Sequence, residues 1–349
     1  MHPLRRTAFV ALAAALAVTG WAAEAQPAAL AAEPARLAAK GLLIGVAAAG
    51  ERLVAVGDRG IIVLSDDHGT TWTQARAVPT QALLTGVCFL DAQHGVAVGH
   101  DEIILTSADA GRSWQRAHYA PEAQRPLLDV WCGGGGHVIA VGAYSAYLTS
   151  VDSGASWSER KFVPAPAAGT AAEAAAAEEA ARGGYHLNRI VAGDGGRLYI
   201  AAESGHLYRS DDGGASWLTL ASPYAGSFFG VLPLGTPAGG RSLLVFGLRG
   251  NLYRSDDAGA SWHKVDTGTV ALLDGAAQFA DGTIAIVGLS GTVLVSRDRA
   301  HTFALLQQVD RAGLAAAVTS GAMRLVAVGE HGPQLINLGS AYASRASAP

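Results

Sequence analysis

Three residues in this chain could together perform hydrolytic chemistry. Asp129 and Asp274 each lie near the start of a short apolar run that is predicted to form a β-strand, and Arg189 lies at the start of another. Paired carboxylates cleave glycosidic bonds, one as an acid and one as a nucleophile or base, and a guanidinium would hold an anionic sugar. Carboxylates at strand starts also commonly serve the connections between strands, so glycoside hydrolysis is kept as an alternative interpretation.

Other catalytic chemistries lack their residue patterns. The chain has no Gly-x-Ser-x-Gly elbow, no His-Glu-x-x-His pair and no cysteine pairs at metal-binding spacing. Its 11 histidines are scattered without ligand spacing, and the glycine run at 133–136 lacks the lysine and following helix of a phosphate-binding loop. We therefore expect no catalytic residue, no metal and no cofactor.

A different motif recurs along the chain, with the pattern Ser-x-Asp-x-Gly-x-Ser/Thr-Trp. It occurs at 65–72, 107–114, 150–157, 210–217 and 255–262, and a sixth copy at 296–303 lacks the glycine and the tryptophan. The aspartate is expected to accept hydrogen bonds within a tight turn, the glycine to adopt a positive φ, and the tryptophan to pack between neighbouring units. These Asp-box residues are predicted to be structural: Asp67, Trp72, Asp109, Trp114, Asp152, Trp157, Asp212, Trp217, Asp257, Trp262 and Asp298.

The spacing of the motifs predicts the fold. Successive motif serines are mostly 41–45 residues apart, which is the length of a four-stranded propeller blade, and each motif follows three short apolar runs. A hairpin precedes each motif, with Val-Gly in four of the six units, and a Val-Gly hairpin occurs once more at 328–332, where no motif follows. The chain is thus predicted to be all-β: a seven-bladed β-propeller over 41–340 with Asp-box turns between third and fourth strands. The last blade should lack its outer strand, which residues 26–40 are expected to supply.

The N-terminus indicates export. Arg5 and Arg6 precede an apolar run of about a dozen residues and an Ala-x-Ala cleavage signal, so residues 1–25 are predicted to be a signal peptide and the protein to be periplasmic or secreted. The remaining features are an Ala/Glu/Pro-rich insertion at 164–184, either a short helix or a loop, and a tail at 341–349. A net charge of −4 disfavours nucleic acid as a partner, and no later run is apolar enough to insert into a membrane.

Propeller geometry separates two faces. The hairpins between second and third strands share one face with the blade connections, and the Asp-box turns emerge on the other. Side chains vary at the hairpins, and variation on a fixed scaffold is typical of a binding surface. The predicted binding residues are Arg59, His100, Asp101, Tyr144, Glu203, Arg249 and His331.

The repeated Ala-Val-Gly hairpin and Asp-box unit, behind a signal peptide, resembles the photosystem II stability/assembly factor family of Asp-box propellers. The resemblance implies a non-enzymatic scaffold that binds a protein partner, a membrane protein or complex contacted from the periplasmic or lumenal side. In that family an arginine-rich patch contacts the client; here Arg59 and Arg249 occupy equivalent hairpins, but His100, Tyr144 and Glu203 do not continue a basic ring. The alternative is an Asp-box glycoside hydrolase of sialidase type, although the Arg-Ile-Pro signature of sialidases is absent.

The two cysteines occupy the same position on the first strands of adjacent blades. Cys88 and Cys132 each lie five residues after the first leucine of a Leu-Leu pair. An exported protein can form disulfides, but bridging requires Cα atoms within about 7 Å of one another. We expect adjacent inner strands to be too far apart and both thiols to be buried and free.

Overall fold

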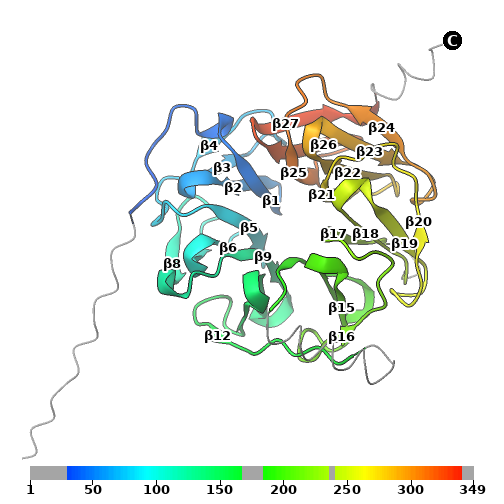
Figure 1. The fold of residues 1–349 in the computed structure, drawn as a ribbon. Coiled ribbons are helices and arrows are strands. Elements are labelled where there is room, and N and C mark those ends of the chain that lie inside the picture. Colours follow the sequence, from blue (N-terminus) through cyan, green and yellow to red (C-terminus); the bar gives the residue numbers. More distant parts are fainter. Residues whose placement is uncertain (1–29, 167–183, 236–239, 340–349) are drawn as a thin grey trace, which may run out of the picture.

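The computed structural model describes residues 30–166, 184–235 and 240–339, which form a ring of seven antiparallel sheets around a central axis (Figure 1). The predicted seven-bladed β-propeller is confirmed. Each blade runs from an inner strand at the axis to an outer strand at the rim. The predicted signal peptide and C-terminal tail, and most of the 164–184 insertion, lie outside the described residues.

Blades one to six have four strands each and blade seven has three. The strands of blades one to three are β1 (Leu43–Ala49), β2 (Arg52–Gly57), β3 (Ile62–Ser65), β4 (Thr73–Gln74), β5 (Leu84–Phe89), β6 (Gly95–Gly99), β7 (Ile104–Ser107), β8 (Gln115–His118), β9 (Leu127–Cys132), β10 (Val138–Gly142), β11 (Tyr147–Ser150) and β12 (Ser158–Glu159). Those of blades four to seven are β13 (Leu187–Ala192), β14 (Leu198–Ala202), β15 (Leu207–Ser210), β16 (Leu218–Thr219), β17 (Phe228–Pro233), β18 (Leu243–Gly247), β19 (Leu252–Ser255), β20 (His263–Lys264), β21 (Leu273–Gln278), β22 (Ile284–Gly288), β23 (Thr292–Ser296), β24 (Ala304–Gln307), β25 (Leu314–Thr319), β26 (Arg324–Gly329) and β27 (Gly332–Asn337).

Short 3-10 turns occur between many of the described strands. They are η1 (Ala38–Lys40), η2 (Asp58–Gly60), η3 (His100–Glu102), η4 (Pro121–Ala123), η5 (Gly134–Gly136), η6 (Ala143–Ser145), η7 (Asp194–Gly196), η8 (Glu203–Gly205), η9 (Leu248–Gly250) and η10 (Leu289–Gly291). Within the described residues, no helix is long and apolar enough to cross a membrane.

The core consists of apolar layers between neighbouring blades. The second strands are the most deeply buried, as in β6, where all five residues are inaccessible to solvent. One layer joins Val96 and Val98 of blade two to Leu127 and Val138 of blade three. Because both faces of each blade are covered in this way, the second strands are buried along their length instead of alternating between buried and exposed residues.

The ring closes differently from the expectation. Residues 30–40 do not add a fourth strand to blade seven, whose sheet has the order β25-β26-β27. This segment lies along blade one instead: Ala32 N–H donates to the Val78 carbonyl, and the Gln74 side chain bonds the backbone of Glu33 and Ala35. The segment forms no strand ladder with β27. Closure comes from packing of β1 against β25 and β26, and of η1 against β27.

The expectation of free thiols is wrong. Cys88 and Cys132 form a disulfide with Cα atoms 5.7 Å apart. They lie near the ends of β5 and β9, where inner strands of adjacent blades approach one another around the axis. The distance is within the range that a disulfide spans, so the estimate of inner-strand separation was too large.

Candidate functional site

The Asp-box turns lie between the third and fourth strands of blades one to six, and their aspartates are fully used in holding the turn. In blade three, both carboxylate oxygens of Asp152 accept hydrogen bonds, Oδ1 from Ser150 Oγ and Ser156 N–H and Oδ2 from Ser156 Oγ. The Ser156 hydroxyl and N–H groups lower the pKa of Asp152 to about 2. A carboxylate with its acceptor sites occupied by its own turn is a structural group, not a free acid or base.

The Asp-box tryptophans contribute an N–H donor as well as apolar area. The indole Nε1 of Trp114 donates to the carbonyl of Gly111 in its own box, and Trp72 and Trp157 make the equivalent bond. The Trp217 indole donates to the Tyr147 hydroxyl of the preceding blade. Trp114 and Trp217 are the most deeply buried, which matches a role in packing between blades.

A set of arginines joins neighbouring blades on the Asp-box face, and the sequence reasoning missed them. Arg52 pairs with Asp66 and donates to the carbonyl of Ala110 in the next box. Arg209 repeats the arrangement with Asp211 and the carbonyl of Ala258. The sequence does carry a sign of these arginines. The second residue of the Asp-box is aspartate, as in Asp66 and Asp211, in the blades where such an arginine is present.

The central channel brings together the three residues considered for hydrolysis. Its wall includes the third residue of every inner strand. This residue is glycine or alanine in five blades, and it is Asp129 in blade three and Arg189 in blade four. These positions are Gly45, Gly86, Asp129, Arg189, Gly230, Gly275 and Ala316. The small residues allow the strands to converge: a Cβ on Gly275 would lie 2.6 Å from Ala316 Cα.

Arg189 lies between two carboxylates in this channel. Its guanidinium nitrogens are 3.7 Å from Asp129 Oδ1 and 3.6 Å from Asp274 Oδ1. Asp129 Oδ2 also accepts the backbone N–H of Ile190 at 2.9 Å. Burial raises the pKa of Asp129, opposed by Arg189, and burial raises the pKa of Asp274 to about 6.

The channel does not have the set of groups that a sialidase-type site needs. The cavity is about 230 Å³, below the usual range for ligand pockets of about 300–1,000 Å³. Its described lining contains a single arginine and no tyrosine, and the remaining residues are mainly glycine, alanine and valine. Asp129 is bonded to the backbone of the next blade, so the three charges mainly join blades three, four and six.

The predicted binding residues lie on six of the seven hairpins, on what we call the hairpin face. Six of the seven, Arg59, His100, Asp101, Tyr144, Arg249 and His331, have exposed side chains. The middle residue of each 3-10 hairpin is left-handed, with φ of 52° at Arg59, 53° at Tyr144 and 58° at Arg249. The backbone therefore presents one residue per hairpin in the same orientation while its identity changes from blade to blade.

Glu203 is placed differently from the other predicted binding residues. Its carboxylate is half-buried and accepts the backbone N–H of His186 at 3.0 Å, with the His186 ring 3.7 Å away. Glu330 does the same for the Gly313 N–H in blade seven. Glu203 thus fixes the chain where it enters blade four.

An aromatic cluster on the hairpin face extends over blades three to five. The Tyr144 ring meets the His186 ring edge-on with centroids 5.1 Å apart, and Tyr185 stacks on His206 at 3.8 Å. His206 and Tyr224 line an open pocket of about 420 Å³ beside the cluster. We call Tyr144, Tyr185, His186, His206 and Tyr224 the aromatic cluster. Of these, only Tyr144 was predicted from the sequence as a binding residue, because Tyr185 and His186 follow the 164–184 insertion and lie outside the repeated hairpin positions.

Blade two replaces the hairpin glycine with a buried carboxylate. Glu102 has φ of 47°, where blades one, four, five and six have glycine. Its carboxylate is 2.6 Å from Arg125 Nε and 3.4 Å from His118 Nε2, and Arg125 also pairs with Glu159. This cluster anchors the connection from blade two to blade three.

No group of three or more His, Cys, Asp or Glu side chains among the described residues is arranged to hold a metal ion.

No family model matches the chain, and no curated protein matches it. Solved structures that share its fold include two of YCF48 and one of a WD40 propeller. YCF48 from Cyanidioschyzon merolae has a TM-score of 0.67 and 17% identity, covering 88% of this chain and 98% of that chain.

The second is a structure of YCF48 bound to D1 peptide, with a TM-score of 0.64 and 17% identity over 85% of this chain and 93% of that one. The WD40 propeller domain of Doa1 has a TM-score of 0.63 and 12% identity, covering 86% and 94%. By fold, the chain is therefore similar to propellers that include YCF48, and the shared architecture is what these comparisons establish.

Proposed function

We propose that this protein is an exported scaffold whose hairpin face binds a protein partner, and that it assists the assembly or stability of a membrane protein complex from the periplasmic side. One observation carries the proposal. A left-handed hairpin geometry that repeats in blades one to six presents side chains of different charge and size, such as Arg59, Asp101 and Tyr144, whereas the Asp-box aspartates on the opposite face are occupied by their own turns. Fixed backbone with varied side chains suits recognition.

The aromatic cluster is the anchor of the proposed binding surface. Tyrosines and other aromatic residues are enriched in the centres of protein interfaces, where they bury large areas at a low cost in side-chain entropy. Tyr144 is 57% exposed, although its ring is held against His186. Arg59 and Arg249 add positive charge at the hairpins of blades one and five, which favours acidic groups on the partner.

The comparisons support a peptide or protein as the ligand. The YCF48 structure that shares this fold is bound to D1 peptide, so a propeller of this shape is able to hold a polypeptide segment. The resemblance in the repeats points the same way. With two arginines on the hairpins instead of a continuous basic ring, the client of this chain is expected to differ from a photosystem subunit.

Glycoside hydrolysis remains the second candidate function because Asp129, Arg189 and Asp274 converge in the channel. It is disfavoured by the small cavity and the single arginine. A panel of fluorogenic sialosides and other glycosides on purified protein separates the two. Turnover that is abolished by Asp129→Asn or Asp274→Asn would establish the hydrolase. If no substrate is turned over, protein binding stays the proposed function.

Site-specific crosslinking tests the proposed binding face. A photoreactive benzoylphenylalanine is placed at Tyr144 on the hairpin face and, as a matched control, at Val151, which is 79% exposed within the Asp-box of the same blade. We expect position 144 to crosslink to a discrete membrane protein in the native envelope and position 151 to give none. Crosslinks from 151 alone would place the interface on the Asp-box face and reject the proposal.

A further inference from the structure

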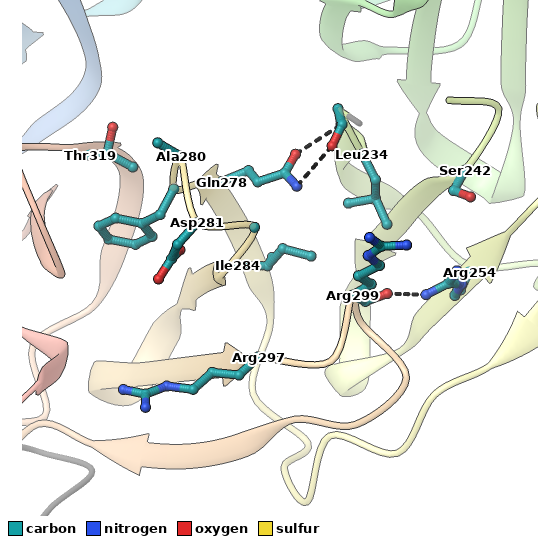
Figure 2. Close-up of a pocket in the computed structure, with 13 residues that line it drawn as sticks. Leu234, Ser242, Arg254, Gln278, Ala280, Asp281, Ile284, Arg297, Arg299 and Thr319 are labelled. Atoms are coloured by element: carbon teal, nitrogen blue, oxygen red, sulfur yellow. Dashed lines mark hydrogen bonds between the residues drawn. The ribbon is translucent and has the colours of Figure 1, made fainter. Parts of the chain in front are cut away.

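A large cavity lies on the Asp-box face between blades five and six, away from the hairpin face. It has a volume of about 850 Å³, within the range of small-molecule sites, and its floor contains Leu234, Phe279 and Ile284. Figure 2 shows two inter-blade links at its edges. The Gln278 side-chain amide exchanges hydrogen bonds with the backbone of Gly235, and Arg254 donates to the Arg299 carbonyl.

Three arginines and one carboxylate line this cavity. Arg254 is buried and pairs with Asp256 outside the lining, whereas Arg297 and Arg299 are exposed at its edge and Asp281 is on the blade-six turn. The Arg299 guanidinium has no hydrogen-bond or ion-pair partner within the described residues, and Figure 2 shows it directed toward Leu234. Arg299 therefore offers a positive charge above an apolar floor, whereas Arg254 is already paired with Asp256.

The repeat shows that Arg299 is not needed for the turn. At the two equivalent junctions, the carbonyl that accepts from the preceding blade's arginine belongs to Ala110 and Ala258, whose side chains are buried. Blade six has Arg299 in this position, with the same left-handed backbone, φ 57° against 58° and 61°. Alanine serves the fold at this position, so the guanidinium is an addition that the turn does not require.

The same box departs from the repeat at two further positions. Ala300 stands where the first five boxes have glycine and has φ of 65°, a conformation that costs a residue with a Cβ about 1–2 kcal/mol. Phe303 replaces the tryptophan, so its indole N–H bond is absent. The aspartate of the box nevertheless keeps its bonds to Ser296, His301 and Thr302. Strained and altered backbone in an otherwise regular repeat is a feature of ligand sites.

We propose that this cavity is a second ligand site that takes a small organic carboxylate with an apolar body, the carboxylate pairing with Arg299 and the apolar part lying on Leu234, Phe279 and Ile284. A guanidinium matches a carboxylate through two parallel hydrogen bonds. A phosphate would carry more negative charge and no apolar surface, and Asp281 in the same lining disfavours a dianion. A carboxylate carrying an aromatic or aliphatic group fits both the charge and the floor.

Calorimetric titration with phenylacetate, its neutral analogue phenylacetamide and inorganic phosphate tests this site on the intact protein. We expect phenylacetate to bind at least about tenfold more tightly than either of the others. Arg299→Ala, which places in blade six the residue of the equivalent boxes, should lower phenylacetate affinity by at least about tenfold without altering the melting temperature. Arg249→Ala removes an exposed arginine from the hairpin face and should leave the affinity unchanged.

Three outcomes would overturn the inference. They are equal affinity for phenylacetate and phenylacetamide, tighter binding of phosphate than of phenylacetate, and an unchanged affinity in Arg299→Ala that has kept its fold. If Arg299→Ala were to unfold, Arg299→Gln, which keeps the aliphatic stem and a hydrogen-bond donor but not the charge, provides the same comparison. These results are independent of the hairpin face, so the proposed protein-binding function stands or falls separately.

Discussion

Asp129 accepts the backbone N–H of Ile190 across the boundary between blades three and four, with Oδ2 2.9 Å from the nitrogen. Asp129→Ala would leave that N–H and part of the Arg189 charge without a partner in a buried place, and should destabilise the fold by about 2–4 kcal/mol. Asp129→Asn keeps an acceptor and should cost about half as much. Urea unfolding of both variants measures the difference; equal losses would mean that the charge and not the acceptor matters.

Asp274 should make the fold less stable as the pH rises, the opposite of a typical salt-bridged carboxylate. Burial raises its pKa from 3.8 to about 6, so the folded state binds a proton more tightly than the unfolded state does. Its contribution is therefore favourable below about pH 4 and is lost as the pH rises through about 6. Relative to Asp274→Asn, wild type should lose about 1–3 kcal/mol over this range.

The comparison with Asp274→Asn is needed because other carboxylates titrate in the opposite direction. The Asp-box carboxylates of Asp152 and Asp212 have pKa values lowered to about 2 by their turn hydroxyls and N–H groups. The stability that they contribute to the fold is therefore lost as the pH falls below about 4. Denaturant unfolding at several pH values from 4 to 7 gives the difference curve. A flat difference between wild type and Asp274→Asn would show that Asp274 has an ordinary pKa.

The disulfide should contribute substantially to stability. Cys88 and Cys132 are 44 residues apart in sequence, and a crosslink that closes a loop of this size is worth about 2–4 kcal/mol. The Cys88→Ser/Cys132→Ser double variant should unfold at lower denaturant by that amount. Alkylation of the denatured, unreduced protein should label neither cysteine in mass spectrometry; labelling of both would show that the thiols are free.

The Asp-box predictions follow from burial and hydrogen bonding. Trp114→Ala removes an indole that is 3% exposed and should cost about 3–5 kcal/mol. Asp109→Ala should cost about 1–3 kcal/mol, because the Ser113 N–H loses its acceptor. Partner capture by the fraction that stays folded should not change in either variant. Thermal and urea unfolding give the losses, and a cost for Trp114→Ala below that of Asp109→Ala would contradict the packing role.

The regular parts of this fold could be predicted from sequence because their causes are local. The turn at 150–157 depends on Ser150, Asp152, Gly154 and Ser156, which are within seven residues of each other. The curvature that brings Cys88 to 5.7 Å from Cys132 depends on the small residues of all the inner strands, such as Gly275 against Ala316, and local patterns do not specify it.

The site was only partly predictable for a similar reason. Tyr144 could be recognised because it occupies a repeated hairpin position, but its ring partner His186 comes from the next blade and follows an insertion that differs from the repeat. Arg299 could have been found by comparing the six boxes position by position, because the sixth box keeps its Ser296, Asp298 and Thr302 but has arginine at two of its three variable positions.

The central claim is that the hairpin face performs binding while the Asp-boxes maintain the fold, and the double variant Arg59→Glu/Arg249→Glu tests it most directly. Both side chains are exposed at left-handed hairpin positions. Melting temperature and capture of the partner crosslinked through position 144 are measured on the same preparation. The account predicts an unchanged melting temperature and reduced capture. Early melting, or undiminished capture by a variant that melts normally, would contradict it.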